Sequence, residues 1–209
     1  MPVSRRGRLI VFEGGEGAGK STHLRRAAAT LRQRGWPVLE TAEPGGTAIG
    51  QQIRRILMDT HAPAPATWTE LFLYLADRAE HVATLIGPAL LRGDIVLCDR
   101  FSASTLAYQG FGRGLDLDLL RQLDGVARQG VEADLVILLD CPVELGLRRA
   151  GRDDRFHRES LAFHEKVRAG FLALAQEHTS KFIIVDTNAP LDEVATRILA
   201  AIDQCLERH

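Results

Sequence analysis

Residues 8–22 read Arg-Leu-Ile-Val-Phe-Glu-Gly-Gly-Glu-Gly-Ala-Gly-Lys-Ser-Thr, an apolar run that leads directly into a glycine-rich loop. Gly14, Gly19, Lys20 and Ser21 occupy the fixed positions of the motif G-x-x-x-x-G-K-[ST], which is typical of loops that bind polyphosphates. Glycines tolerate backbone conformations that a Cβ would resist, so successive N–H groups can point at phosphate oxygens. We expect the lysine to reach the β- and γ-phosphates of a nucleoside triphosphate and the serine to hold Mg²⁺. The residues expected to bind the triphosphate are Gly14, Gly15, Glu16, Gly17, Ala18, Gly19, Lys20, Ser21 and Thr22.

The residues on either side of the loop fit this interpretation. The run before it is continuously apolar, as in a strand covered on both faces, and apolar residues recur at helical spacing after it. Five such runs predict strands over 8–13, 37–41, 94–98, 134–140 and 181–186. Helical patterns lie over 49–57, 71–90 (where Pro88 should kink or divide the helix), 103–109, 117–129, 143–150, 159–178 and 191–207. This alternation predicts one α/β domain over 1–209, with a parallel five-stranded sheet of the P-loop NTPase type flanked by helices on both faces.

Composition and charge favour small-molecule partners. The 209 residues are 45% hydrophobic and 25% charged, with a formal net charge of −1. Such a balance predicts no basic surface for a nucleic-acid polymer or an anionic membrane, and no apolar run approaches the roughly 20 residues of a membrane span. The cysteines at 98, 141 and 205 form no metal-binding pattern, so we expect a reduced, cytoplasmic protein, with Cys98 in the core rather than acting as a nucleophile.

Charged residues follow the predicted strands at their carboxyl ends, where parallel α/β sheets bind ligands. Asp99 and Arg100 come directly after the third run. We expect Asp99 to hold Mg²⁺ together with Ser21, and Arg100 to bind a phosphate bidentately. The alternative for Asp99 is a helix cap or a local ion pair with Arg100.

Two further sets of residues are candidates for the same cleft. Tyr74 and Arg78 lie one helical turn apart, so a ring and a guanidinium could grip a nucleotide together; a core Tyr74 with a solvated Arg78 is an equal alternative. The segment 148–158 is polar and crowded with charge, which predicts a lid whose arginines neutralise charge during phosphoryl transfer. Its candidates are Arg148, Arg149, Arg152 and Arg155; a solvated basic helix end is the alternative.

Taken together, these segments resemble the thymidylate kinases, which phosphorylate dTMP to dTDP with ATP. The resemblance covers nearly the whole chain. Its anchors are Phe-Glu-Gly-Gly-Glu-Gly-Ala-Gly-Lys-Ser-Thr at 12–22, Glu-Pro-Gly-Gly-Thr at 43–47, Ala-Asp-Arg at 76–78, Asp-Arg-Phe at 99–101, Ser-Thr-Leu-Ala-Tyr-Gln-Gly at 104–110, Gly-Arg-Gly at 112–114 and Asp-Arg-Phe at 154–156. It implies a nucleoside monophosphate kinase-like fold with a short lid, ATP and dTMP as substrates, Mg²⁺, a role in dTTP biosynthesis, and a homodimer for which the helix over 71–90 could provide the surface.

Position by position, the resemblance also implies how the acceptor is held. Tyr74 would stack on thymine, and Arg78 would contact the pyrimidine edge or a nearby phosphate. Thr105 and Gln109 match positions near the base. Tyr108 matches one beside the deoxyribose that disfavours a 2′-hydroxyl.

The same comparison assigns the phosphate groups. Glu16 would face the 3′-hydroxyl of the sugar, and Arg100 would bind the acceptor phosphate. Gly17 stands where one branch of the family has an arginine, so the catalytic arginine should come from the lid, as in the bacterial branch; Arg152 is the first choice and Arg149 the second. The expected catalytic residues are therefore Lys20, Arg100, Arg152 and Arg149.

Some features depart from the family pattern, and two rival functions stay open. Ala42 stands where bacterial members commonly have an arginine, and the lid is a few residues shorter than in some relatives. A P-loop kinase for another nucleotide or nucleoside is the nearer rival. A nucleotide switch is the more distant one, because the guanine-binding tetrapeptide N-K-x-D does not occur.

Overall fold

The computed structural model describes residues 6–151, 155–156 and 158–207. The strands are β1 (Arg8–Glu13), β2 (Val38–Ala42), β3 (Ile95–Asp99), β4 (Leu135–Asp140) and β5 (Phe182–Asp186). The α-helices are α1 (Lys20–Gln33), α2 (Ala48–Met58), α3 (Thr67–His81), α4 (Gly87–Arg92), α5 (Ser102–Thr105), α6 (Leu117–Arg128), α7 (Val143–Ala150), α8 (Leu161–Glu177) and α9 (Leu191–Glu207). Two π-helical segments, η1 (Val82–Ile86) and η2 (Leu106–Gly112), continue α3 and α5.

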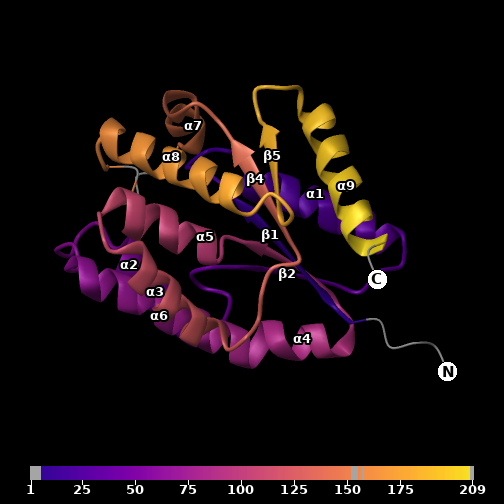
Figure 1. The fold of residues 1–209 in the computed structure, drawn as a ribbon, viewed down its shortest axis with the longest axis horizontal. Helices are drawn as coiled ribbons and strands as arrows, with labels where there is room; N and C mark the ends of the chain where they lie inside the picture. The colour runs from indigo at the N-terminus through magenta and orange to yellow at the C-terminus, as the bar shows by residue number, and fades with distance from the viewer. Residues whose placement is uncertain (1–5, 152–154, 157, 208–209) are drawn as a thin grey trace.

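The five strands form one parallel sheet in the order β2-β3-β1-β4-β5, so β1 is central (Figure 1). This confirms the predicted fold, and each strand begins and ends within one residue of the predicted run. Phe12 of β1 and Ala42 of β2 both pair with Asp99 of β3. The segments that follow these strands therefore leave the sheet at one edge, where we expect ligands to bind.

Helices cover both faces of the sheet, which explains why β1 is apolar throughout. Ile10 and Phe12 belong to a core that the strands form with α1 and α9. Leu9 and Val11 point to the opposite face, where η1, α4 and the start of the β3–α5 connection pack. Figure 1 shows α1 and α9 on one side of the strands and α3 to α6 on the other.

The helical segment predicted over 71–90 is longer and less regular than expected. It begins at Thr67 and runs to Arg92, and its irregular part is η1, which lies just before Pro88. A proline cannot donate a main-chain hydrogen bond and its ring crowds the preceding turn, so Gly87 N–H bonds instead to the carbonyl of Val82, five residues back. The second π-helical segment, η2, replaces the end of the helix predicted over 103–109. π-helical turns are often found at functional sites, and η2 carries Tyr108 and Gln109.

None of the helices in the described part of the chain has the length and apolar character of a membrane span. The cysteines at 98, 141 and 205 are buried and form no disulfide in the described part of the chain. Cys98 donates its S–H to the carbonyl of Arg100 at 3.0 Å, and burial raises the pKa of its thiol well above the usual value. Cys98 is thus part of the core, as predicted, and not an activated nucleophile.

Candidate active site

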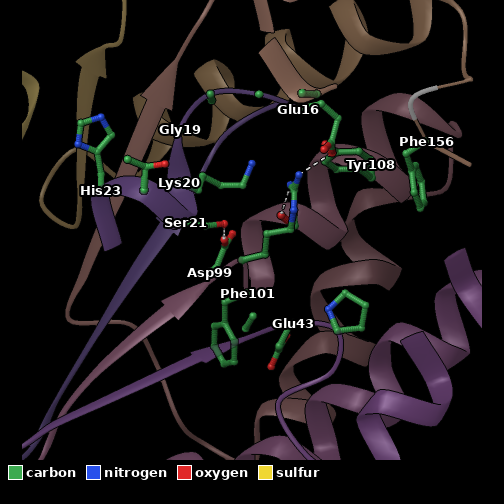
Figure 2. Close-up of a pocket in the computed structure, with 18 of the residues that line it drawn as sticks. Glu16, Gly19, Lys20, Ser21, His23, Glu43, Asp99, Phe101, Tyr108 and Phe156 are labelled. Carbon is green, nitrogen blue, oxygen red and sulfur yellow. Dashed lines mark hydrogen bonds and ion pairs between the residues drawn. The ribbon is translucent and has the colours of Figure 1, made fainter. Parts of the chain in front are cut away.

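A cavity of about 830 Å³ lies at the carboxyl edge of the sheet (Figure 2). One wall is the glycine-rich loop with the start of α1. The other is formed by side chains of α3, α5 and η2, and the turn after β2 closes one end. The lining residues that the sequence predicted are Glu16, Gly17, Ala18, Gly19, Lys20, Ser21, Thr22, Tyr74, Arg78, Asp99, Arg100, Thr105, Tyr108, Gln109 and Arg149. Gly14 and Gly15 line a small separate pocket instead.

The glycine-rich loop has the conformation that its glycines permit. Gly14, Gly17 and Gly19 have φ values of 138°, 64° and 90°, in the region that side chains resist. At Gly17 space is also limiting, because a Cβ there would lie 1.8 Å from the carbonyl oxygen of Gly146 on α7. A larger residue at this position would force α7 away from the loop.

Lys20 lies inside the curve of the loop. Its Nζ donates to the carbonyls of Gly14 and Gly15 at 3.0 and 2.7 Å. Burial, followed by the charge of Arg100, lowers the pKa of Lys20 to about 8, against the opposing effect of Glu16 and Asp99. A bound polyphosphate would oppose this shift, since a nearby anion favours the charged ammonium. Lys20 therefore lies where an anion bound at the loop would stabilise its charge.

Ser21 and Asp99 meet at the mouth of the loop. The Ser21 hydroxyl donates to Asp99 Oδ2 at 2.6 Å, and Figure 2 shows the two side chains pointing at each other beside Lys20. No cluster of three His, Cys, Asp or Glu side chains suited to a metal occurs in the described ranges. The two oxygens fit Mg²⁺, which usually takes few protein ligands and completes its shell with water and substrate phosphates.

Arg100 joins the glycine-rich loop to the far wall. Its φ of 73° places it in the left-handed region, a strained conformation that is typical of functional sites for a residue other than glycine. Its guanidinium donates to Glu16 Oε1 at 2.6 Å and to the Gly14 carbonyl at 3.1 Å. It also lies 5.1 Å from the ring centre of Tyr108, whose hydroxyl donates to the same Glu16 oxygen at 2.8 Å. An acceptor phosphate near this group would meet a cation whose position is already fixed.

The charge of Glu16 is stabilised in this arrangement. Burial by itself would raise the pKa of its carboxyl, but the charges of Arg100 and Lys20 and the hydrogen bond from Tyr108 lower that pKa to about 2. Glu16 is thus a fixed anion between the loop and the far wall, on the acceptor side of the cavity, and it holds Arg100 and the Tyr108 hydroxyl in place.

Glu13 supports Arg100 from behind, and the sequence analysis missed it. This residue is 0% exposed and accepts hydrogen bonds from the main chain of Phe101 and Ser104 and from the Ser104 hydroxyl. Burial raises the pKa of its carboxyl against these hydrogen bonds. Its signal in the sequence is an acid that directly follows four apolar residues at a strand end. Such an acid needs buried partners, which here shape the turn that carries Arg100.

Three aromatic rings form a slot in the far wall. Tyr74 on α3 and Tyr108 on η2 lie 6.4 and 5.5 Å from the ring of Phe156, the latter pair edge to face. Phe156 belongs to the predicted lid and is 5% exposed. The prediction singled out the tyrosines but not Phe156, although an aromatic residue in a charged segment is itself a signal.

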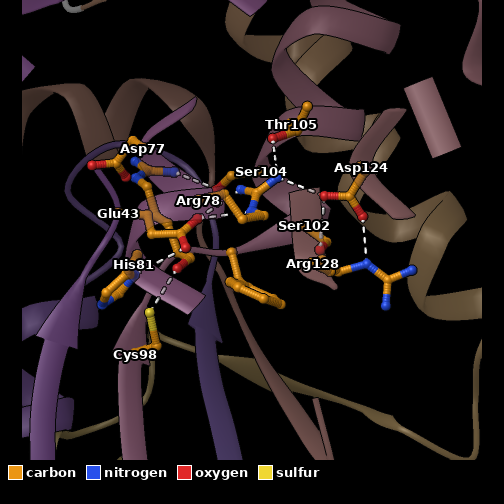
Figure 3. A network of polar contacts seen from close by, with 12 residues as sticks. Glu43, Asp77, Arg78, His81, Cys98, Ser102, Ser104, Thr105, Asp124 and Arg128 are labelled. Atoms are coloured by element: carbon orange, nitrogen blue, oxygen red, sulfur yellow. Dashed lines mark hydrogen bonds and ion pairs between the residues drawn. The ribbon is translucent and has the colours of Figure 1, made fainter. Parts of the chain in front are cut away.

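Arg78 is buried in an ion network, so the alternative of a solvated side chain is wrong (Figure 3). Its guanidinium pairs with Glu43 at 2.8 Å and Asp124 at 2.6 Å, and it donates to the Thr105 hydroxyl at 2.9 Å. Burial by itself would lower the pKa of Arg78, but the two carboxylates raise it above its usual value. His81 also bonds to Glu43, at 3.0 Å. The network holds Thr105 and the turn after β2 against the cavity, and Arg78 itself lines the cavity.

The lid arginines are not equivalent. Arg149 lines the cavity and donates to the Thr187 carbonyl at 3.3 Å. Arg155 instead bonds to the carbonyls of Asp59, Ala62 and Pro63 in the α2–α3 connection. Arg148 is exposed, and Arg152 lies outside the described residues.

The sequence analysis also missed the wall beyond Arg149. The residues that line the cavity there come from α1, from the connection between β5 and α9, and from the start of α9. They are His23, Thr187, Ala189, Leu191 and Val194. For the residues that follow β5 the signal is position, because the carboxyl end of β5 lies at the edge of the sheet where ligands gather.

Comparison with known proteins gives one family. The family model described as thymidylate kinase matches residues 12–198. The chain is 48% identical over 211 residues to a thymidylate kinase of Desulfovibrio desulfuricans, covering 96% of this chain and 97% of that protein. It is 50% identical over 201 residues to one of Geobacter sulfurreducens, covering 92% and 94%. A solved thymidylate kinase structure from Ehrlichia chaffeensis is similar in fold, with a TM-score of 0.80, 28% identity and coverage of 94% of this chain and 98% of that one.

Proposed function

The chain belongs to the thymidylate kinase family, whose members make dTDP from dTMP and ATP, and we propose which of its residues bind each substrate and which assist phosphoryl transfer. The observation that carries the proposal is the construction of a single cavity with two different walls. The glycine-rich loop offers main-chain N–H groups and Lys20 to a triphosphate. The opposite wall offers the aromatic rings of Tyr74, Tyr108 and Phe156, against which a base can stack. ATP binds the first wall and dTMP the second.

The acceptor needs no general base. The second pKa of a phosphate monoester is about 6, so dTMP is mostly a dianion near pH 7 and is already nucleophilic. The remaining work is to align two anions that repel each other and to neutralise the charge that builds up between them. Arg100 lies where the two walls meet, fixed by Glu16, and takes the acceptor phosphate. Lys20 takes the β- and γ-phosphates of the donor.

Mg²⁺ is held by Ser21 and Asp99, whose oxygens lie 2.6 Å apart. When bound, the ion neutralises phosphate charge and orients the γ-phosphoryl group for transfer. The remaining positive charge comes from the lid: Arg152 is our first choice for the γ-phosphate and Arg149, which reaches the cavity, is the second. Arg155 is not a candidate because its guanidinium is bound to main-chain carbonyls outside the cavity.

The protein is a homodimer in this proposal. The surface through which it dimerises extends beyond the helix predicted over 71–90. Neighbouring helices α2, α3 and α6 expose large apolar side chains: Ile49, Ile56, Trp68, Phe72, Leu119 and Val126. Exposed apolar residues that gather on adjacent elements are typical of protein interfaces. The compartment is the cytoplasm, which agrees with three cysteines that form no disulfide in the described residues.

An ADP-release assay with ATP and a panel of acceptors tests the function. We expect turnover with dTMP, weaker turnover with dUMP, and little with CMP, AMP or thymidine. Lys20→Ala should remove turnover with every acceptor while the protein stays folded. A preference for thymidine or for another monophosphate would instead identify a P-loop kinase of different specificity.

A further inference from the structure

Glu70 is a buried acid that the reaction described above does not use. It lies in the first turn of α3 and is only 3% exposed. Its Oε1 accepts hydrogen bonds from Gln109 Nε2 at 3.0 Å and Arg113 Nε at 3.2 Å, and its Oε2 accepts one from Arg113 Nη2 at 3.2 Å. All three hydrogen bonds to this carboxylate come from other side chains, so both of its oxygens act as acceptors.

This carboxylate fixes the orientation of the Gln109 side chain. An amide has a donor end and an acceptor end, whereas an ionised carboxylate can only accept. The Nε2 end must therefore face Glu70, and the Oε1 end must face away from it. Gln109 is 1% exposed, so an amide turned the other way would place its oxygen against a buried carboxylate at a large cost.

The free end of this amide belongs to the acceptor wall of the cavity. Gln109 lines the cavity together with Tyr74, Phe156 and Thr105. Glu70 and Tyr74 are four residues apart on α3 and share one face of the helix. Glu70 thus lies next to the aromatic slot, and it would act on a ligand there through Gln109 rather than by direct contact.

The geometry points to Glu70 as the positioning residue that decides which hydrogen-bonding pattern of a pyrimidine the slot accepts. With Nε2 held by Glu70, Gln109 offers an acceptor oxygen, which suits a base that carries an N–H donor at its ring edge. Thymine and uracil have that donor at N3, whereas cytosine has an unprotonated acceptor there. This inference rests on the proposed function and deepens it, since it concerns how the same site selects its acceptor.

The test compares dTMP with 5-methyl-dCMP, which keeps the methyl group, sugar and phosphate and changes only the ring edge. In Glu70→Gln the introduced amide can present either end to Gln109. Arg113 competes for the introduced oxygen, which favours the reversed Gln109 amide. We expect the ratio of kcat/KM for dTMP to that for 5-methyl-dCMP to fall at least tenfold, since sites built around such a hydrogen bond reject the wrong partner by large factors. The control is Arg113→Gln, which breaks the same ion pair but leaves the carboxylate, and should keep the ratio within about threefold of the wild type.

An unchanged ratio in Glu70→Gln, or an equal fall in both variants, would overturn the inference, because a merely structural role would lower both activities together. Arg113 keeps its ion pair with Glu159 at 2.7 Å in Glu70→Gln, so the variant strands no cation. If thermal melting shows that it is nevertheless unfolded, Glu70→Asp, whose shorter side chain withdraws the acceptor from Gln109, replaces it under the same criterion. Absence of dTMP phosphorylation by the wild-type protein would refute the proposed function instead, so the two failures are distinguishable.

Discussion

Replacing Arg78 by methionine should cost about 4 kcal/mol of folding free energy. The guanidinium is 1% exposed and pairs with two carboxylates that are themselves 4% and 3% exposed, those of Glu43 and Asp124. The two acids do not lose the same share of their hydrogen-bond partners when Arg78 is replaced. Asp124 keeps Arg128 at 2.8 Å and Ser102 at 3.1 Å, whereas Glu43 keeps, in the described part of the chain, the side chain of His81 alone. Breaking a buried pair by removing one partner costs about 3–5 kcal/mol, because the remaining charge is left without compensation.

This energy converts into a measurable shift of the melting temperature. An unfolding entropy of about 2.1 cal/mol/K per residue over 209 residues gives roughly 0.4 kcal/mol/K, so 4 kcal/mol lowers Tm by about 10 °C. Calorimetry and urea unfolding should agree on the loss. Arg121→Met is the control: Arg121 also pairs with two acids, but its side chain is 38% exposed, so its loss should cost less than about 1 kcal/mol.

The double variant Arg78→Met/Glu43→Gln tests the cause of the loss. If the cost comes from the stranded Glu43 charge, neutralising this acid should recover part of the stability, so the double variant melts above Arg78→Met. Equal Tm values for Arg78→Met and Arg121→Met, or no recovery in the double variant, would refute the reasoning.

Four further outcomes are expected. Arg152→Ala should lower kcat at least tenfold and leave the KM for dTMP within about twofold; an unchanged kcat in steady-state assays would remove this residue from the γ-phosphate. Asp99→Asn should raise the Mg²⁺ concentration needed for half-maximal activity about tenfold or more in a metal titration, since it loses an anionic ligand, and an unchanged Mg²⁺ curve would contradict the metal site. The pKa of Glu16 is about 2 in the folded chain and about 4.5 when unfolded, so the stability from its ionised form is present above pH 4.5 and is lost as pH falls toward 2. The Tm difference between wild type and Glu16→Gln should therefore stay constant from about pH 6 to 5, where Lys20 is charged, and shrink below pH 5. Val126→Asp should yield monomers in sedimentation experiments, whereas Leu91→Asp, at an exposed apolar site on α4, should not.

The sequence predicted what depends on local pattern. The strand boundaries followed from continuous apolar runs, because a central parallel strand needs apolar residues on both faces. The loop with Lys20 and Ser21 followed from fixed spacing, because the main chain must curve around a phosphate. Asp99 and Arg100 followed from their place at a strand end, and the structure brings both to the predicted cavity.

The buried acids could not be predicted in the same way. Glu13, Glu70 and Asp124 are each satisfied by partners far along the chain: Glu13 by residues 88 and 91 positions away and Asp124 by one 46 positions away. Nothing local to a glutamate says whether it will face water or an arginine from another helix. For Glu70 the sequence does indicate one thing, which is the side of the helix: Glu70, Tyr74 and Arg78 recur every fourth residue on α3 and therefore share a face.

The partners of the lid arginines could not be predicted from the sequence either. The sequence analysis ranked Arg152 first and Arg149 second, but residue type alone could not separate the arginines, because a guanidinium suits a phosphate and a main-chain carbonyl equally well. Arg155 is bound to three carbonyls of the α2–α3 connection, and a carbonyl carries no mark of residue type. Which arginine is left for the nucleotide is therefore decided by where the main chain of another segment passes. By binding that segment, Arg155 holds the neighbouring Phe156 against Tyr74 and Tyr108, so an arginine that points away from the cavity still shapes the aromatic slot.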